Sequence, residues 1–210
     1  MNNLVIITAF LESVPNIKPL KKQHPFIICI DGGYDISLQH EFKADLLMGD
    51  FDSIESDLPD NIPIECFPPE KDYTDLELAL KKAVDLDAQN VTVLGGIGGR
   101  LDHTIANMQL LASYTGKFKS LVMLDGRNKC FVVNGSLDGQ TVIPGDEDSY
   151  LSIFSLTEKC IGVTMNGVKY PLENHTLTRE FPLGVSNEFK EKEAVLSIKD
   201  GTLLVIISKK

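Results

Sequence analysis

The amino-acid sequence predicts two domains: an α/β N-terminal domain with a mostly parallel sheet over residues 1–126, and a smaller all-β sandwich C-terminal domain over residues 127–210. Two observations carry this prediction. Up to residue 125, short apolar runs alternate with longer segments of helical spacing, which is the pattern of a parallel sheet covered by helices. After Gly126 the runs are short and separated by Gly, Asn, Pro and Asp, as in a sandwich or small barrel.

The first half contains the alternation from which the parallel sheet is predicted. Helices are expected from Tyr73 to Asp87 and from Leu101 to Ser113, because both segments place apolar residues at helical spacing. In the first of these segments the apolar residues follow Thr74. Strands are expected at residues 4–8, 26–30, 45–48, 63–67, 91–94 and 121–124.

The second half shows no helical period. Strands are expected at residues 129–133, 150–156, 160–165, 194–198 and 202–208. The last two runs flank Lys199-Asp200-Gly201, a turn sequence that predicts a β-hairpin.

Composition excludes several classes of protein. The chain has 210 residues, with 30 Asp and Glu against 20 Lys and Arg, for a net charge of -10. A nucleic-acid binder needs a basic face that displaces counterions from phosphates, so no nucleic-acid partner is expected. The four cysteines form no CxxC pair, which argues against a zinc site or a disulfide framework and is typical of reduced thiols.

The apolar run at residues 4–11 follows no basic region and is too short to span a bilayer. No export signal and no membrane association are therefore expected, and the predicted location is cytoplasmic.

The negative charge is concentrated in one block. Residues 45–77 contain eleven acids and a single base, Lys71. A run of like charges is usually a solvated surface. Several of these acids, however, directly follow predicted strands, and the carboxyl ends of parallel strands meet at one edge of a sheet, where ligands bind.

Two acidic loops follow such strands. The first is Asp31-Gly32-Gly33, which alone is also typical of an ordinary turn. The second is Gly49-Asp50-Phe51-Asp52-Ser53, in which an extended backbone would point Asp50 and Asp52 in the same direction. Carboxylates so close together favour a neutralising cation, and hard oxygen ligands suit Mg²⁺; a solvated Asp-rich turn is the alternative.

The third loop, Lys71-Asp72-Tyr73-Thr74-Asp75, opens a predicted helix. Asp72 or Thr74 can cap this helix, and Asp75 in its first turn favours the helix dipole. The alternative is functional: Lys71 would bind phosphate, and Asp75 would be a further metal ligand.

The fourth loop runs from Gly95 to His103 with the sequence Gly-Gly-Ile-Gly-Gly-Arg-Leu-Asp-His. Glycines allow backbone N–H groups to approach an anion, a helix follows, and Arg100 can bind phosphate with two N–H groups. The loop matches neither GxxxxGK[ST] nor GxGxxG. His103 is expected either at the ligand or as a capping or packed histidine. The four loops together predict a site for Mg²⁺ and a polyphosphate.

These motifs, in this order, resemble the thiamine pyrophosphokinase family: Asp-Gly-Gly (31–33), Gly-Asp-Phe-Asp-Ser (49–53), Lys-Asp-x-Thr-Asp (71–75) and Gly-Gly-x-Gly-Gly-Arg-x-Asp-His (95–103). Residues 167–172 and 184–188 resemble the family's thiamine-binding segments. The resemblance implies transfer of the pyrophosphoryl group of ATP to the hydroxyl of thiamine, giving thiamine diphosphate and AMP. It also implies a homodimer with sites at the subunit interface.

The resemblance carries residue roles to matching positions. Asp50, Asp52 and Asp75 would hold Mg²⁺, and Asp31 or Asp102 would orient or deprotonate the thiamine hydroxyl. Ser186 and Asn187 would contact the aminopyrimidine. The nucleotide would be bound by Lys71, Asp72, Thr74, Gly95, Gly96, Gly98, Gly99, Arg100 and His103.

Tyr170 stands where some relatives carry tryptophan, and this chain contains no tryptophan. Its ring offers an aromatic face to the cationic thiazolium or to the pyrimidine. An ordinary aromatic of the sandwich core is the alternative.

Two other functions use the same residues. An apolar strand followed by Asp-x-Asp also resembles phosphatases of the haloacid-dehalogenase type, with Asp50 as nucleophile and Asp52 as acid. That pattern usually has Thr or Val where Ile54 stands, and lies near the N-terminus. A non-catalytic nucleotide-binding module would bind ATP without turnover.

Overall fold

The structure is a computed structural model of residues 1–210 and describes residues 1–68, 70 and 72–210. It divides into two compact units, Met1–Gly126 and Arg127–Lys210. No helix in these described ranges is long and apolar enough to cross a membrane.

The N-terminal unit is built on a parallel sheet. Its strands are β1 (Asn3–Ile7), β2 (Phe26–Ile30), β3 (Leu46–Gly49), β4 (Ile64–Cys66), β5 (Asn90–Leu94) and β6 (Ser120–Asp125). The pairs β1–β2, β1–β5, β2–β3, β3–β4 and β5–β6 are all parallel. The runs of Val, Ile and Leu in β1, β2 and β5 are buried on both faces, as the near-continuous apolar sequence predicts.

The strand order within this unit is β6-β5-β1-β2-β3-β4. The chain first moves outward from β1 to β4, and then returns through α3 to place β5 on the other side of β1. The point between β1 and β5 is therefore the topological switch point, outside which open α/β sheets bind their ligands.

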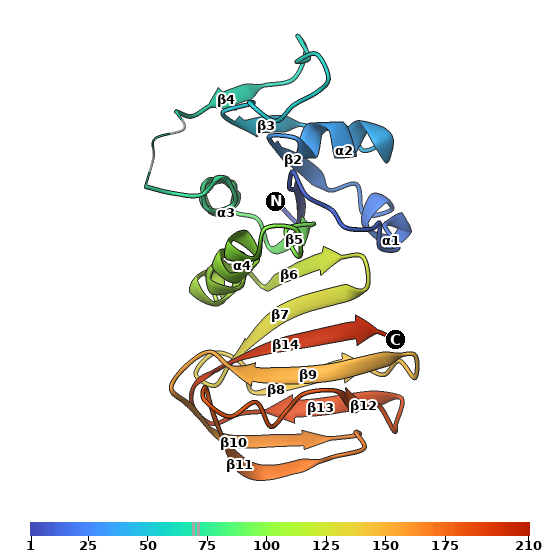
Figure 1. The fold of residues 1–210 in the computed structure, drawn as a ribbon, viewed down its shortest axis with the longest axis vertical. Coiled ribbons are helices and arrows are strands. Elements are labelled where there is room, and N and C mark those ends of the chain that lie inside the picture. The colour runs from blue at the N-terminus through green and yellow to red at the C-terminus, as the bar shows by residue number, and fades with distance from the viewer. Residues whose placement is uncertain (69, 71) are drawn as a thin grey trace. The chain divides into compact units, whose positions relative to one another are not determined.

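The helices are α1 (Lys18–Lys21), α2 (Gly33–Gln39), α3 (Asp75–Asp85) and α4 (Leu101–Tyr114). Figure 1 shows α3 and α4 on one face of the sheet and α1 and α2 on the other. Tyr34 of α2 packs with Val5, Ile7 and Cys29 in one apolar cluster, so α2 covers the odd-numbered positions of β1. The expected helices at 73–87 and 101–113 match α3 and α4 with small shifts of their ends.

The C-terminal unit contains two antiparallel sheets. Its strands are β7 (Asn128–Asn134), β8 (Gln140–Pro144), β9 (Ser149–Ser155), β10 (Lys159–Asn166), β11 (Leu172–Thr178), β12 (Asn187–Glu188), β13 (Glu193–Ser197) and β14 (Thr202–Lys209). One sheet has the order β12-β9-β14-β7 and the other β11-β10-β13-β8.

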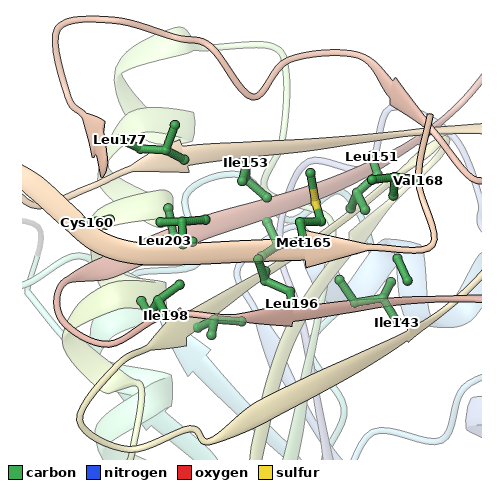
Figure 2. Close-up of a cluster of buried hydrophobic side chains, with 14 of the residues drawn as sticks. Ile143, Leu151, Ile153, Cys160, Met165, Val168, Leu177, Leu196, Ile198 and Leu203 are labelled. Atoms are coloured by element: carbon green, nitrogen blue, oxygen red, sulfur yellow. The ribbon is translucent and has the colours of Figure 1, made fainter. Parts of the chain in front are cut away.

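A single apolar core lies between these two sheets (Figure 2). Leu151, Ile153 and Leu203 come from one sheet, and Met165 and Leu196 come from the other; all are at most 1% exposed. Both predicted architectures, an α/β domain with a parallel sheet and an all-β sandwich, are confirmed.

The hairpin predicted at residues 199–201 is wrong. β13 pairs with β10 and β8, whereas β14 pairs with β7 and β9. The turn therefore carries the chain from one sheet to the other, and Ile161 holds it by accepting from the Lys199 N–H and donating to the Asp200 carbonyl, both at 2.9 Å. Alternating apolar residues occur both in two paired strands and in strands of two sheets that face one core. The turn sequence therefore could not distinguish a hairpin from a connection between the two sheets.

Candidate active site

Asp31 stands at the carboxyl end of β2 and organises the loop that follows β3. Its Oδ1 accepts the backbone N–H groups of Asp50 at 3.0 Å and Phe51 at 3.2 Å. Gly49 has a φ of 144°, and a Cβ at this position would lie 1.7 Å from Asp31 Oδ1. Glycine is therefore required at residue 49 for the Asp31 carboxylate to reach this loop.

The electrostatics of Asp31 show that three acids from separate loops converge. Its pKa is raised from 3.8 to about 6 by burial, with further contributions from the Asp75 and Asp50 carboxylates. The two N–H groups that it accepts oppose the rise without cancelling it. A negative potential shared by carboxylates is the condition that a cation relieves.

The loop at residues 50–53 differs from its predicted conformation. Phe51 has a φ of 63°, and the Asp52 N–H donates to Asp50 Oδ1 at 3.2 Å, so the segment is a tight turn and not an extended strand. Asp50 is half-buried beside Asp31, whereas Asp52 is exposed. Ser53 has a structural part in this motif, because its Oγ accepts the Gly32 N–H at 3.2 Å and joins the two acidic loops.

The third acidic segment begins α3. Thr74 is the N-cap and accepts the Glu77 N–H at 3.2 Å, which selects Thr74 over Asp72 as the cap. Asp75 opens the helix and is half-buried, and Asp72 is exposed. Lys71, predicted to bind phosphate, lies outside the described residues.

The glycine loop after β5 uses its first N–H groups within the chain. Gly95 donates to the Leu124 carbonyl at 2.8 Å, Gly96 to the Phe10 carbonyl at 2.8 Å, and Ile97 to Asp125 Oδ2 at 3.3 Å. Gly98 donates to Thr104 Oγ1 at 3.0 Å. Of the glycines expected to approach a phosphate, Gly95, Gly96 and Gly98 therefore donate their N–H groups to partners within the chain.

The glycines instead allow close packing at this loop. A Cβ on Gly95 would lie 2.2 Å from the Phe10 carbonyl oxygen. Thr8 Oγ1 donates to that same oxygen at 3.0 Å, and Asn107 Nδ2 donates to the Gly96 carbonyl at 2.8 Å. The loop is fixed against the segment after β1 and against α4.

Arg100 and Asp102 form an exposed pair at the start of α4. Arg100 donates through Nε at 3.2 Å and through Nη2 at 2.6 Å to the two carboxylate oxygens of Asp102. This hydrogen bonding raises the pKa of Arg100 and lowers the pKa of Asp102. Their side chains are 72% and 65% exposed, so the pair contributes little to stability and can exchange partners. His103 is exposed on the same turn.

A hollow of about 290 Å³ brings these elements together at the switch point. It is lined from the ends of β1, β2 and β5, from the first turn of α3 and from the first two turns of α4. Asp31, Asp75, Arg100 and His103 lie on it together with apolar side chains, whereas Asp50, Asp52 and Asp102 are outside its lining. Acids, a guanidinium and an apolar wall share one cavity.

Asp31, Asp50 and Asp75 form the acid cluster of this site. Within residues 1–68, 70 and 72–210, no group of three or more His, Cys, Asp or Glu side chains is arranged to hold a metal. Mg²⁺ commonly takes one or two carboxylates and completes its shell with water and substrate phosphates. Asp50 and Asp75, both acting on Asp31, fit a cation shared with phosphates.

Sequence reasoning missed Asp125, at the end of β6. The residue is 1% exposed, and its carboxylate accepts the N–H groups of Glu12 at 3.0 Å, Ser13 at 3.5 Å and Ile97 at 3.3 Å. Burial raises its pKa against these three bonds. Asp125 therefore ties the segment after β1 to the glycine loop. The sequence signal that could have found Asp125 is an acidic residue at the end of an apolar strand.

The predicted thiamine contacts lie together in the C-terminal unit. Asn187 is 4% exposed, and its side chain accepts the Tyr170 N–H at 3.0 Å and donates to the Tyr170 carbonyl at 2.8 Å. Tyr170 is 61% exposed, which excludes the core alternative for its ring. Ser186 is exposed, with a φ of 56°.

Comparisons with known proteins agree across both units. The catalytic-domain model of thiamin pyrophosphokinase matches residues 17–124, more than half of the chain, and the vitamin B1 binding-domain model of the same family matches residues 140–203. The thiamine pyrophosphokinase of Bacillus subtilis is 29% identical over 201 residues, covering 93% of this chain and 92% of the relative. Thiamin pyrophosphokinase 1 of Caenorhabditis elegans is 27% identical over 167 residues, covering 77% and 69%.

Solved structures give the same result. The Bacillus subtilis enzyme superposes with a TM-score of 0.88 at 26% identity and full coverage of both chains. The Geobacillus thermodenitrificans thiamin pyrophosphokinase has a TM-score of 0.85 at 28% identity, covering 100% and 98%. The family predicted from the motifs is confirmed, and neither the phosphatase nor the non-catalytic module is supported. The chain belongs to the thiamin pyrophosphokinase family.

Proposed function

We propose that this chain transfers the pyrophosphoryl group of ATP to the hydroxyl of thiamine, giving thiamine diphosphate and AMP. One observation carries the proposal beyond family membership. The carboxylates of Asp50, after β3, and Asp75, at the start of α3, contribute to the raised pKa of Asp31, and Arg100 lines one cavity with Asp31 and Asp75. The carboxylates can bind a cation and the guanidinium of Arg100 can bind phosphate, so the site suits a polyphosphate that arrives with a cation.

In this reaction the hydroxyl oxygen of thiamine attacks the β-phosphorus of ATP. The bond between that phosphorus and the oxygen bridging to the α-phosphorus breaks, AMP leaves with the bridging oxygen, and the hydroxyl proton passes to a base. Catalysis of this kind depends on positioning and charge stabilisation.

We assign Mg²⁺ binding to Asp50, Asp75 and Asp52, the last of which is exposed on the same turn as Asp50. When bound, the cation supplies charge neutralisation to the phosphates. Asp31 holds the turn that presents Asp50 through its two accepted N–H groups. Lys71, with Asp72 and Thr74 in the same segment, completes the proposed nucleotide site.

Arg100 is proposed to bind phosphate, because its planar guanidinium matches two phosphate oxygens as it now matches the Asp102 carboxylate. A phosphate that takes this guanidinium frees Asp102. The carboxylate is then available to orient or deprotonate the thiamine hydroxyl. Asp31, with a pKa of about 6, is the second candidate for this base.

Thiamine is proposed to bind the C-terminal unit through Tyr170 and Ser186. Asn187 contributes by fixing the backbone of Tyr170, since both ends of its amide are engaged there. We also propose a homodimer with sites at the subunit interface and a cytoplasmic location; the four cysteines, which form no disulfide in the described residues, are compatible with that location. Sedimentation equilibrium of the purified chain tests the dimer.

The bond that breaks provides the test of the reaction. ATP labelled with ¹⁸O at the oxygen bridging the α- and β-phosphorus is incubated with the protein, Mg²⁺ and thiamine. Attack at the β-phosphorus leaves the label in AMP and forms thiamine diphosphate in equal amount. Formation of ADP with thiamine monophosphate would contradict the proposal, as would release of orthophosphate without any thiamine product.

A further inference from the structure

Phe10 lies at the candidate active site and has no role in the function proposed above. Phe10 follows β1 and lines the hollow, and the residue is 41% exposed, so it is accessible to a ligand in the hollow. Phe10 was not singled out by any sequence motif.

The position of the ring is set by the glycine loop. The Phe10 carbonyl accepts bonds from the Gly96 N–H at 2.8 Å and from Thr8 Oγ1 at 3.0 Å. Ring atoms would lie 3.0 Å from a Cβ on Gly99 and 3.2 Å from a Cβ on Gly98, so the loop backbone packs directly on the ring. The absence of side chains at these glycines leaves the ring close to the backbone that leads to Arg100.

The cavity beside the ring has the character of a small-molecule site. Its volume of about 290 Å³ is near the lower end of the roughly 300 to 1,000 Å³ found for such sites. Ile30, Leu76 and Ala106 contribute apolar wall, and the charged groups Asp31, Asp75 and Arg100 are on the same lining. A ligand that is flat and apolar at one end and polyanionic at the other matches this division.

We propose that Phe10 is the surface on which the nucleobase of ATP stacks, an inference that rests on the proposed function for the identity of the nucleotide. Aromatic rings bind bases through their faces with little dependence on base identity. The same loop fixes Phe10 and carries Arg100, so the base platform and the phosphate ligand are positioned together. Thiamine, whose proposed contacts lie in the other unit, is the competing occupant that the test must separate.

The test compares a ligand that contains a nucleobase with a polyphosphate that lacks one. Dissociation constants for Mg·ATP and for Mg·tripolyphosphate are measured by calorimetry on the full chain and on Phe10→Ala, Phe10→Leu and Phe10→Tyr. Phe10→Ala is expected to weaken ATP binding roughly tenfold and to leave tripolyphosphate binding unchanged. Phe10→Tyr retains the ring face and is expected to bind ATP as the wild type does, whereas Phe10→Leu retains packing against the glycines and weakens ATP binding only.

Leu38→Ala is the matched control, because Leu38 is 49% exposed in the same unit and does not line the hollow. Equal weakening of ATP and tripolyphosphate in Phe10→Ala would overturn the proposal by assigning the ring to loop support. Unchanged ATP binding with a raised KM for thiamine would overturn it by assigning the ring to the acceptor. Failure of the wild type to form AMP would instead refute the proposed function, since the binding comparison needs no turnover.

Discussion

The two units of the chain use their buried and strained residues in different ways. In the N-terminal unit, Asp31 and Phe51 adopt positive φ angles beside the acid cluster, and the carboxylate of Asp125 is buried under the glycine loop. In the C-terminal unit, the central cluster is apolar and draws on both sheets (Figure 2). The comparison teaches that buried carboxylates are placed where ATP is proposed to bind, while the core of the sandwich is built by ordinary apolar packing.

The largest expected effect is on activity in the N-terminal unit. Asp50→Asn removes a carboxylate proposed to hold the cation, so kcat/KM should fall roughly 100- to 1,000-fold, with an unchanged unfolding curve. Asp57→Asn, which neutralises an exposed acid of the same acidic block, is the control and should retain activity. Equal activity of the two variants, measured as AMP formation at saturating Mg²⁺, would remove Asp50 from the site.

A change in the sandwich core should act on stability instead. Leu196→Ala truncates a side chain that is 0% exposed between the sheets, so the free energy of unfolding should fall by about 3 kcal/mol. Calorimetric binding of Mg·ATP should stay at the wild-type level while the variant is folded. Leu137→Ala, at a position that is 60% exposed, should change neither quantity. A loss of ATP affinity in folded Leu196→Ala would break the comparison between the units.

Gly49→Ala should combine both effects in one residue. The new Cβ would collide with the Asp31 carboxylate in a backbone conformation that L-residues rarely adopt, at an expected cost of about 2 kcal/mol in unfolding free energy. ATP affinity should fall as well, because the loop that presents Asp50 moves. Gly139→Ala is a suitable control, since its Cβ would meet nothing within 4 Å. Similar denaturation midpoints for the two variants would contradict the assigned role of Gly49.

The smallest expected effect is on the free energy of unfolding, which is lowered by the partly buried negative charge of Asp31. Because its pKa in the folded state is about 6, above the ordinary value of 3.8, the folded state binds more protons than the unfolded state between these values, and stability falls as pH rises through this window. Asp31→Asn removes this cost and keeps an oxygen that accepts both N–H groups. In metal-free buffer it should be more stable than the wild type by about 1–2 kcal/mol above pH 6 and equally stable below about pH 4, after discounting for partial solvation.

Chemical denaturation across this pH range measures the difference. A stability difference that stays constant with pH would show that Asp31 does not titrate as described.

Much of the fold was predictable because its strands are strongly apolar. β2 was predicted with its observed ends, and β1, β5, β10 and β14 within one residue at each end. β11 was missed because its central residues, Glu173, Asn174 and His175, are polar and exposed. α2 was missed because it begins within the turn-like sequence Asp31-Gly32-Gly33. In both cases pairing or packing with the rest of the unit determines the structure more than local preference does.

The candidate site was predictable as a set of loops but not in its contacts. The rule that ligands bind at the carboxyl ends of strands grouped Asp31, Asp50, Asp75 and Arg100. No local pattern indicated that Asp125 would accept three N–H groups, that Asn187 would bind the backbone of Tyr170, or that Phe10 would line the hollow. Such roles depend on residues distant in sequence that meet only in the folded chain.

The central claim is that the acid cluster and Arg100 serve pyrophosphoryl transfer to thiamine. Its most direct test is AMP formation by the wild-type chain with ATP and Mg²⁺, measured with and without thiamine. The account predicts AMP only when thiamine is present, in equal amount to thiamine diphosphate. Orthophosphate released at the same rate in both samples, with no AMP in either, would contradict it.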